Sequence, residues 1–257
     1  MASAKENAIA LYLEGIQNGH PREAVAAYTG DHYTQHSTGV ADGAEGFIAF
    51  FEPFIARNRK RDFEIVRALQ DGRHVFVQCY QKINDGEAEW LTTDFFDSDA
   101  DGKIIEHWDV IAPIKPENPS GRTQIDGPTA IVDHDKTSAN KALVVDFINT
   151  CLIGRDLSRA ADFINAQTYI QHNADVGDGL DAFLDLYGAS DSPMAYQECF
   201  LAVGEGNFVA TLNRATWDGH DLCQVDLFRV EDGKIIEHWD NSEPVPPKNE
   251  WANSGKF

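Results

Sequence analysis

The chain has 257 residues, 42% of them hydrophobic, and its 42 acidic and 21 basic side chains give a formal net charge of −21. The hydrophobic fraction is that of a folded protein. The charge argues against nucleic-acid and anionic-membrane binding, because both need a basic surface.

The cysteines carry no metal-binding or redox spacing. Cys79, Cys151, Cys199 and Cys223 form no C-x-x-C or C-x-x-H group, which is typical of core-filling thiols. No apolar run approaches the roughly 20 residues that a membrane span needs. The first residues lack the basic and apolar blocks of a secretory signal. We therefore expect a cytoplasmic protein that does not associate with a membrane.

One segment occurs twice. Residues 101–109 and 232–240 both read Asp-Gly-Lys-Ile-Ile-Glu-His-Trp-Asp, 131 positions apart, which indicates a duplication. The stretch Asn118-Pro119-Ser120-Gly121-Arg122 between the copies resembles Asn253-Ser254-Gly255-Lys256 in the tail, and we expect the tail to lie as a strap over a domain. The predicted boundaries are a first copy at 1–115, a linker at 116–135, a second copy at 136–245 and the strap at 246–257.

Each copy begins with helices and continues with strands. Apolar residues at helical spacing predict a helix at Asn7–Gln17, with a counterpart at Thr137–Leu152. A shared Tyr-x-Gln-His frame follows at 33–36 and 169–172. In chain order, the further elements are a helix at Ala44–Arg57 and strands at Arg61–Gln70, His74–Tyr80 and Trp90–Phe96, then a helix at Leu180–Tyr187 and strands at Phe208–Arg214 and Leu222–Phe228.

The duplicated segment holds the main chemical candidates. Asp-Gly favours a hairpin turn, since glycine accepts a positive φ, and the following residues read as the returning strand. Period-two alternation puts Ile105, His107 and Asp109 on one face, and likewise Ile236 with the second His–Asp pair. Such a pair can act as a coupled proton-transfer unit. The alternative is a polar face turned to water.

The hairpin register decides which residue lies opposite the second histidine. A three-residue loop, which we favour, places Asp226 opposite His238. A two-residue Asp-Gly turn would place Leu227 there instead. Asp94 is the counterpart of Asp226 in the first copy.

This order of elements predicts an α+β fold. In each copy a curved antiparallel sheet would wrap around the N-terminal helices and form a cone with an internal pocket. We expect two such tandem cone-shaped barrels, packed as an intramolecular pseudo-dimer.

Each half resembles a SnoaL-like domain of the nuclear-transport-factor-two-like superfamily, through the Tyr-x-Gln-His frame and the closing His-Trp-Asp strand. The resemblance covers residues 3–115 and 136–245. It implies polyketide-cyclase chemistry, an intramolecular aldol condensation without metal or cofactor. Other branches are isomerases or lyases, or bind ligands without turnover. Many members are bacterial and dimeric; here the fused halves would supply the dimer, so the chain could be a monomer in solution.

The resemblance also implies roles for individual residues. The aspartate of the closing strand would be the catalytic acid/base, assisted by its neighbouring histidine, which gives Asp109 with His107 and Asp240 with His238. The substrate would be a small apolar carbonyl compound. The residues expected to contact it are Tyr33, His36, Trp90, Asp94, Tyr169, His172 and Asp226.

The sequence leaves three functions open. An acid/base cyclase, isomerase or lyase would need Asp109 or Asp240 for turnover, a ligand-binding module would not, and a scaffold would fill its pockets with side chains. A two-His-one-carboxylate metal site is a further alternative. Its ligands would be His36, His107 and Asp109, or His172, His238 and Asp240. This spacing fits no local metal motif, so we expect no metal ion.

Overall fold

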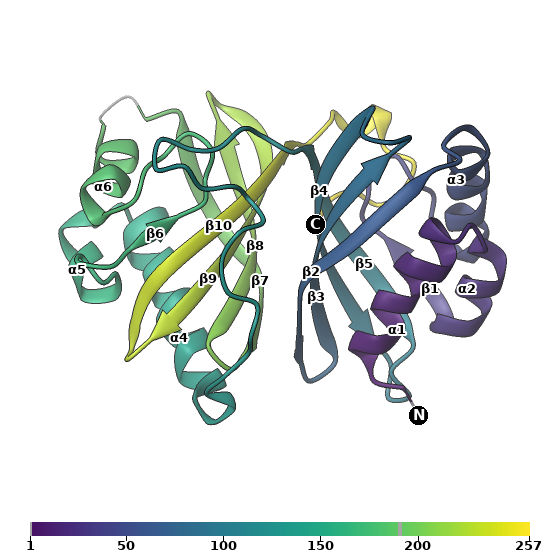
Figure 1. Cartoon of the computed structure of the whole chain (residues 1–257), viewed down its shortest axis with the longest axis horizontal. Helices are drawn as coiled ribbons and strands as arrows, with labels where there is room; N and C mark the ends of the chain where they lie inside the picture. The colour runs from purple at the N-terminus through teal and green to yellow at the C-terminus, as the bar shows by residue number, and fades with distance from the viewer. Residues whose placement is uncertain (1, 190–191) are drawn as a thin grey trace. The chain divides into compact units, whose positions relative to one another are not determined.

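The chain forms two compact units in a computed structural model that describes residues 2–189 and 192–257. Unit 1 comprises Met1–Pro113 and Pro246–Phe257, and unit 2 comprises Ile114–Val245. Each unit has one five-stranded sheet with its helices against one face (Figure 1). The predicted α+β fold with a tandem duplication is confirmed.

The helices of unit 1 pack an apolar stripe onto the sheet. Helix α1 (Ala4–Ala10) begins with a capping box, in which the Ser3 hydroxyl accepts from the Glu6 amide and the Glu6 carboxylate accepts from the Ser3 amide. It continues into the π-helical η1 (Leu11–Gln17), as the predicted helix requires. The other helices are α2 (Pro21–Tyr28) and α3 (Gly43–Arg57), with the short η5 (Lys248–Glu250) in the tail.

The sheet of unit 1 has the order β1-β5-β4-β3-β2. Its four long strands are consecutive antiparallel neighbours, so hairpins connect them. The strands are β1 (Thr29–Gln35), β2 (Arg61–Asp71), β3 (His74–Ile83), β4 (Ala88–Ser98) and β5 (Ile104–Pro113).

Unit 2 repeats this architecture, with the sheet order β6-β10-β9-β8-β7. Its helices are η2 (His134–Lys136), α4 (Thr137–Phe147), η3 (Ile148–Ile153), η4 (Leu157–Arg159), α5 (Ala160–Phe163) and α6 (Leu180–Gly188). Its strands are β6 (Ile170–Gln171), β7 (Met194–Glu205), β8 (Phe208–Trp217), β9 (His220–Glu231) and β10 (Lys234–Pro244).

The Tyr-x-Gln-His frame supplies a fifth strand that the sequence did not predict. In both units it pairs in parallel with the closing strand, which places Gln35 beside His107 and Gln171 beside His238. Each sheet is therefore mixed, with four antiparallel strands and one parallel edge strand. The alternating apolar pattern reveals the four long strands, whereas this short polar segment lacks that pattern.

The predicted register of the second hairpin is wrong. The turn is the two-residue Asp232–Gly233, both at positive φ, with Glu231 paired to Lys234. A β-bulge between Ile235 and Glu237 then adds one residue, so that His238 pairs with Phe228. Because positions two apart share a face, Asp226 still lies on the same face as His238.

A bulge in each unit changes which isoleucine lies beside the histidine. The sequence predicts that Ile105 and Ile236 share the histidine face, whereas Ile104 and Ile235 are the ones that belong to the buried clusters beside the helices. An extra residue breaks the simple period of two upstream of the histidine. The histidine and aspartate keep the shared face that their spacing predicts.

No helix among residues 2–189 and 192–257 combines the length and apolarity needed to cross a membrane.

The turn between β7 and β8 should depend on Gly206. Its φ is +59°, and a Cβ there would lie 2.1 Å from the Val132 carbonyl oxygen. We expect Gly206→Ala to lower the free energy of unfolding of unit 2 by more than about 2 kcal/mol, since backbone strain and a clash add. Gly233→Ala is the control, because it has a similar φ and open space around the new Cβ. Urea unfolding should show the larger loss for Gly206→Ala, and equal losses would contradict the clash.

Candidate active site

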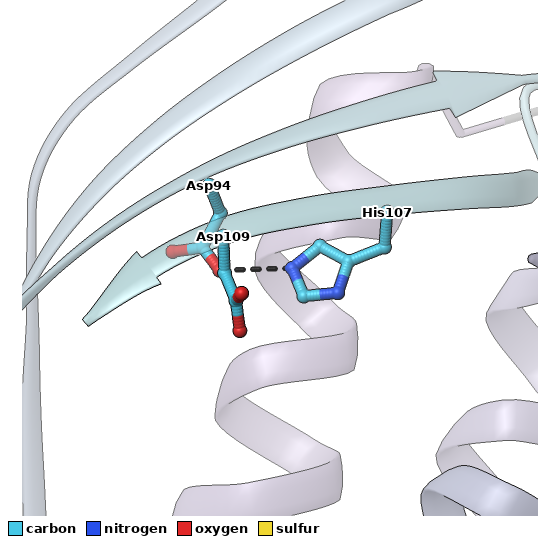
Figure 2. A group of neighbouring side chains, drawn as sticks. All are labelled: Asp94, His107 and Asp109. Atoms are coloured by element: carbon cyan, nitrogen blue, oxygen red, sulfur yellow. Dashed lines mark hydrogen bonds and ion pairs between the residues drawn. The ribbon is translucent and has the colours of Figure 1, made fainter. Parts of the chain in front are cut away.

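His107, on the closing strand of unit 1, bonds side chains of both neighbouring strands, and Figure 2 shows its bond to Asp94. Its Nε2 lies 2.9 Å from Oδ1 of Asp94 on β4, and its Nδ1 lies 3.0 Å from Oε1 of Gln35 on β1. The Ser37 amide also donates to Oε1 of Gln35, which makes that atom an acceptor. Nδ1 of His107 therefore carries a proton, and Nε2 is the nitrogen that meets Asp94.

Asp94 is fully buried beneath this histidine. Its Oδ1 also accepts a 2.5 Å hydrogen bond from the Tyr12 hydroxyl, whereas its Oδ2 has no hydrogen-bond partner among the described residues. Burial raises the pKa of Asp94, although its bonds to His107 and Tyr12 act in the opposite direction.

Asp109 lies two residues after His107 on the same face of β5, and its side chain lines the cavity. Its Oδ1 accepts a 2.9 Å hydrogen bond from Nζ of Lys256, and both side chains are buried. Burial alone would raise the pKa of Asp109, but the charges of Lys256 and His107 outweigh it, so the pKa lies below its ordinary value. Asp109 is thus a carboxylate at neutral pH.

The cavity that Asp109 and His107 line has a volume of about 310 Å³. Its wall is mainly aromatic, and Phe50 and Ile111, which are 40% and 39% exposed, mark its opening. A concave apolar site with a few polar groups is the usual form of a small-molecule site. Other aromatic lining residues are Phe47, Phe51, Phe54, Trp90 and Phe96.

Tyr33 is a neutral donor in the same cavity wall. Burial, with the nearby Asp109 and Asp94 carboxylates, raises the pKa of Tyr33 far above its ordinary value. Its ring lies nearly parallel to the His107 ring, with centroids 6.5 Å apart. Its hydroxyl accepts a long hydrogen bond from Nε2 of Gln35 and so can donate its own proton to a ligand.

His36 lies on the other face of the closing strand, not beside the cavity as expected. Its Nδ1 donates to the Gly255 carbonyl, its Nε2 lies 2.9 Å from Oε1 of Glu106, and its ring stacks on Trp108. Glu106 and Trp108 alternate with His107 along β5, so their contacts belong to the opposite face. His172 repeats this arrangement in unit 2, with Thr123, Glu237 and Trp239 as its neighbours.

Unit 2 repeats the hydrogen bonds that join a glutamine, a histidine and an aspartate on three neighbouring strands. His238 lies 3.0 Å from Oδ1 of Asp226 and 2.9 Å from Oε1 of Gln171. Asp226 has more donors than Asp94, because the Tyr196 hydroxyl and the Asn213 and Gln224 amides also bond it. Both carboxylates thus have a tyrosine partner, from the N-terminal helix in unit 1 and from β7 in unit 2.

Asp240 differs from Asp109 in its partners. Amides of Asn173 and Gln224 donate to it, at 2.5 and 3.4 Å. Burial raises the pKa of Asp240, and the neighbouring Asp226 adds to this, so the net shift is opposite to that of Asp109. Tyr169 is buried here, in edge-to-face contact with Phe183.

Asp94, His107 and Asp109 could offer three metal-ligand atoms within 4.8 Å of one another. However, the Lys256 ammonium already bonds Asp109, and Tyr12 and His107 share one oxygen of Asp94. A divalent ion would have to displace these partners and would meet the repulsion of the ammonium, so the set fits a metal ion poorly. The two-histidine sets are not assembled, because His36 and His172 face away.

Sequence reasoning missed four residues of this site: Tyr12, Gln35, Ser37 and Lys256. Gln35 had a signal, since it is part of the repeated frame and the following histidine drew attention instead. Lys256 lies in the tail that echoes the linker, but nothing local shows that its side chain enters unit 1.

Removing the Tyr12 hydroxyl should destabilise unit 1 in a pH-dependent way. Its bond favours the ionised form of Asp94. Tyr12→Phe should therefore cost about 1–3 kcal/mol, with the larger loss above the Asp94 titration and the smaller loss below it. Urea unfolding at several pH values checks this, with Tyr28→Phe near the surface as the control. A loss that does not vary with pH would contradict the assignment.

Comparison with known proteins gives one family match. Residues 9–107 match the family model of the SnoaL-like domain. A search of curated proteins gave no significant match. Solved structures with similar folds include a candidate polyketide cyclase from Bacillus cereus, at 19% identity and TM-score 0.38, covering 42% of this chain and 73% of that chain. A candidate ketosteroid isomerase from Kribbella flavida has 18% identity and TM-score 0.37, covering 44% and 87% of the two chains.

IdmH, a candidate polyketide cyclase from Streptomyces antibioticus, has 18% identity and TM-score 0.37, covering 43% of this chain and 92% of that chain. Similarity at this level does not indicate a shared reaction. Residues 9–107 are thus similar to a SnoaL-like domain, and the second half of the chain repeats the sheet, the closing strand and the buried His–Asp pair of the first.

Proposed function

We propose that unit 1 is an acid/base enzyme that acts on a small apolar carbonyl compound without metal or cofactor. The observation that carries this proposal is Asp109, a buried carboxylate kept ionised at the wall of an aromatic cavity. The lowered pKa keeps Asp109 deprotonated, and so able to accept a proton at neutral pH, at the cost of a lower basicity. The free cysteines fit a cytoplasmic protein, and the resemblance to SnoaL-like domains fits a bacterial one.

The proposed reaction begins with enolisation. Asp109 removes a proton from the carbon next to the substrate carbonyl. The electron pair of that C–H bond forms the C=C bond of the enolate, and the π pair of the carbonyl moves onto its oxygen. The hydroxyl of Tyr33 donates a hydrogen bond to the resulting enolate oxygen, where charge develops. The enolate then attacks a second carbonyl in a cyclase, or takes a proton at another carbon in an isomerase.

His107 has a supporting role in this proposal. Both of its ring nitrogens are bonded, to Asp94 and Gln35, so it presents no free nitrogen to a ligand. It holds the β5 backbone that carries Asp109, and its charge favours ionised Asp109. The donor expected of this histidine from the sequence is better supplied by Tyr33.

We place the reaction in unit 1 and not in unit 2. Asp240 has amide partners and a raised pKa, whereas Asp109 has a cation and a lowered pKa. The ionised form that a base needs is therefore favoured at Asp109 and disfavoured at Asp240. His238 and Asp240 would then serve the fold of unit 2, or the binding of a ligand there.

Deuterium exchange tests the base directly, because cyclases and isomerases of this kind share enolisation. We expect the protein to accelerate exchange of the α-protons of 2-tetralone in D₂O, followed by proton NMR. Asp109→Asn should lower the rate at least about 100-fold, since general-base catalysis contributes that much. Tyr33→Phe should lower it at least about tenfold.

Two further variants serve as controls. The exposed Asp31→Asn and the unit 2 variant Asp240→Asn should keep the wild-type exchange rate, and far-UV circular dichroism should show all variants folded. Wild-type exchange by a folded Asp109→Asn variant would remove Asp109 as the base. Binding of 2-tetralone without accelerated exchange would favour a ligand-binding module.

A further inference from the structure

The strap Pro246–Phe257 brings one cation into the interior of unit 1. Lys256 is only 1% exposed, although lysine is rarely buried without a function for its charge. Its ammonium bonds a carboxylate that lines the cavity. Lys256 itself is not a cavity-lining residue, so it acts from behind Asp109.

The strap is anchored by contacts that do not involve this charge. The Asn253 amide donates to the carbonyls of Ser37 and Val40, at 2.6 and 2.8 Å. The Ala252 amide donates to the Thr38 carbonyl, and the Gly255 carbonyl accepts from His36. Burying a charge pair carries a desolvation cost that an apolar side chain would avoid. Docking of the strap therefore gives no reason for a lysine here.

Unit 2 provides an internal comparison. There Asn118 anchors the linker through the carbonyls of Gln171 and Val176, and Thr123 accepts from His172. Arg122 matches Lys256 in the sequence echo, but the histidine contacts make Thr123 the structural counterpart of Gly255, and the next residue, Gln124, the counterpart of Lys256. Its neutral amide donates to the backbone carbonyl of Asp240, at 3.4 Å, instead of pairing with the carboxylate.

We propose that Lys256 is a positioning residue of the unit 1 site, which holds the Asp109 carboxylate in place and keeps it ionised inside the apolar cavity. The catalytic use of that carboxylate rests on the proposed function, but the pairing does not. The strap in unit 1 and the linker in unit 2 thus make the halves different. Asp109 has a direct cation partner, whereas Asp240 has none among the described residues.

The other charged and titratable groups around each aspartate are similar. Asp109 faces His107 of the same strand, Asp94 of β4 and Tyr33 of β1, with a hydrogen bond from Ser37. The groups near Asp240 are His238, Asp226, Lys115, Tyr169, Tyr187 and Tyr196. Of the cations, Lys115 is exposed and bonds Asp175, whereas Lys256 bonds Asp109 directly.

The test is the titration of Asp109 itself, followed by NMR of protein with ¹³C-labelled aspartate carboxyl groups, with Asp109→Asn to identify the resonance. Lys256→Met keeps the apolar stem and removes the charge. It should raise the titration midpoint of Asp109 by at least about one pH unit. Lys256→Arg, which keeps the charge, should return the midpoint most of the way to the wild-type value. Gln124→Met is the matched control and should leave the Asp240 titration unchanged.

Hydrogen exchange of the Ala252 amide shows whether the strap stays docked, and it should be equally slow in wild type and Lys256→Met. An unchanged Asp109 titration, an equal shift of Asp240 in Gln124→Met, or loss of Ala252 protection in Lys256→Met would each overturn the proposal. In the pH profile of 2-tetralone exchange, the pH at which the rate falls on the acid side should rise together with the titration midpoint of Asp109. If the titration shifts but no variant or wild-type protein accelerates exchange, the proposed function fails and the role of Lys256 stands.

Discussion

The structure of each half depends on a histidine whose two ring nitrogens are bonded to different strands. In unit 1, His107 joins Gln35 of the parallel edge strand to Asp94 of the antiparallel neighbour. All three side chains are buried, and an unmet polar group there would cost about 1–3 kcal/mol. The edge strand, the bulge that sets the histidine face and the buried aspartate are therefore mutually dependent. Asp109 follows two residues after His107, so the hydrogen bonds of His107 to Gln35 and Asp94 also fix the place of Asp109 at the cavity wall.

The elements that the sequence predicts well are those with local signals. Most of the helices and long strands, and the shared face of His107 and Asp109, follow from periodicity. Strand β7 is an exception, because the sequence predicts no strand at Met194–Glu205. The register does not, because one bulged residue shifts every later pairing and no composition signal marks it. The cavity and its ion pair depend on contacts across long sequence separations, such as Lys256 with Asp109. Local spacing also gave His36 undue weight, since a neighbouring residue in the frame, Gln35, is the one that turns inward.

The two halves treat their buried aspartates differently. Cys79 in β3 and Asn213 in β8 occupy equivalent positions, because each lies opposite the residue two before the aspartate. The Asn213 amide bonds Oδ2 of Asp226, whereas Oδ2 of Asp94 has no hydrogen-bond partner among the described residues. Unit 2 thus satisfies its carboxylate more fully, which favours stability. Unit 1 keeps an unsatisfied buried oxygen, a cost that folded proteins mainly tolerate where it serves a function.

The letter-for-letter repeat of the closing strand therefore has a structural explanation on both faces. Asp-Gly forms the turn, and the first isoleucine fills the core. On the inner face the histidine bonds Gln and Asp, while on the outer face Glu106 and Trp108 hold His36, which in turn holds the strap. Nearly every residue of the strand has a partner from another segment, so the fold alone can preserve the repeat. The chemical difference between the halves must then lie where they diverge, and Lys256 against Gln124 is the divergence that gives Asp109 a cation partner.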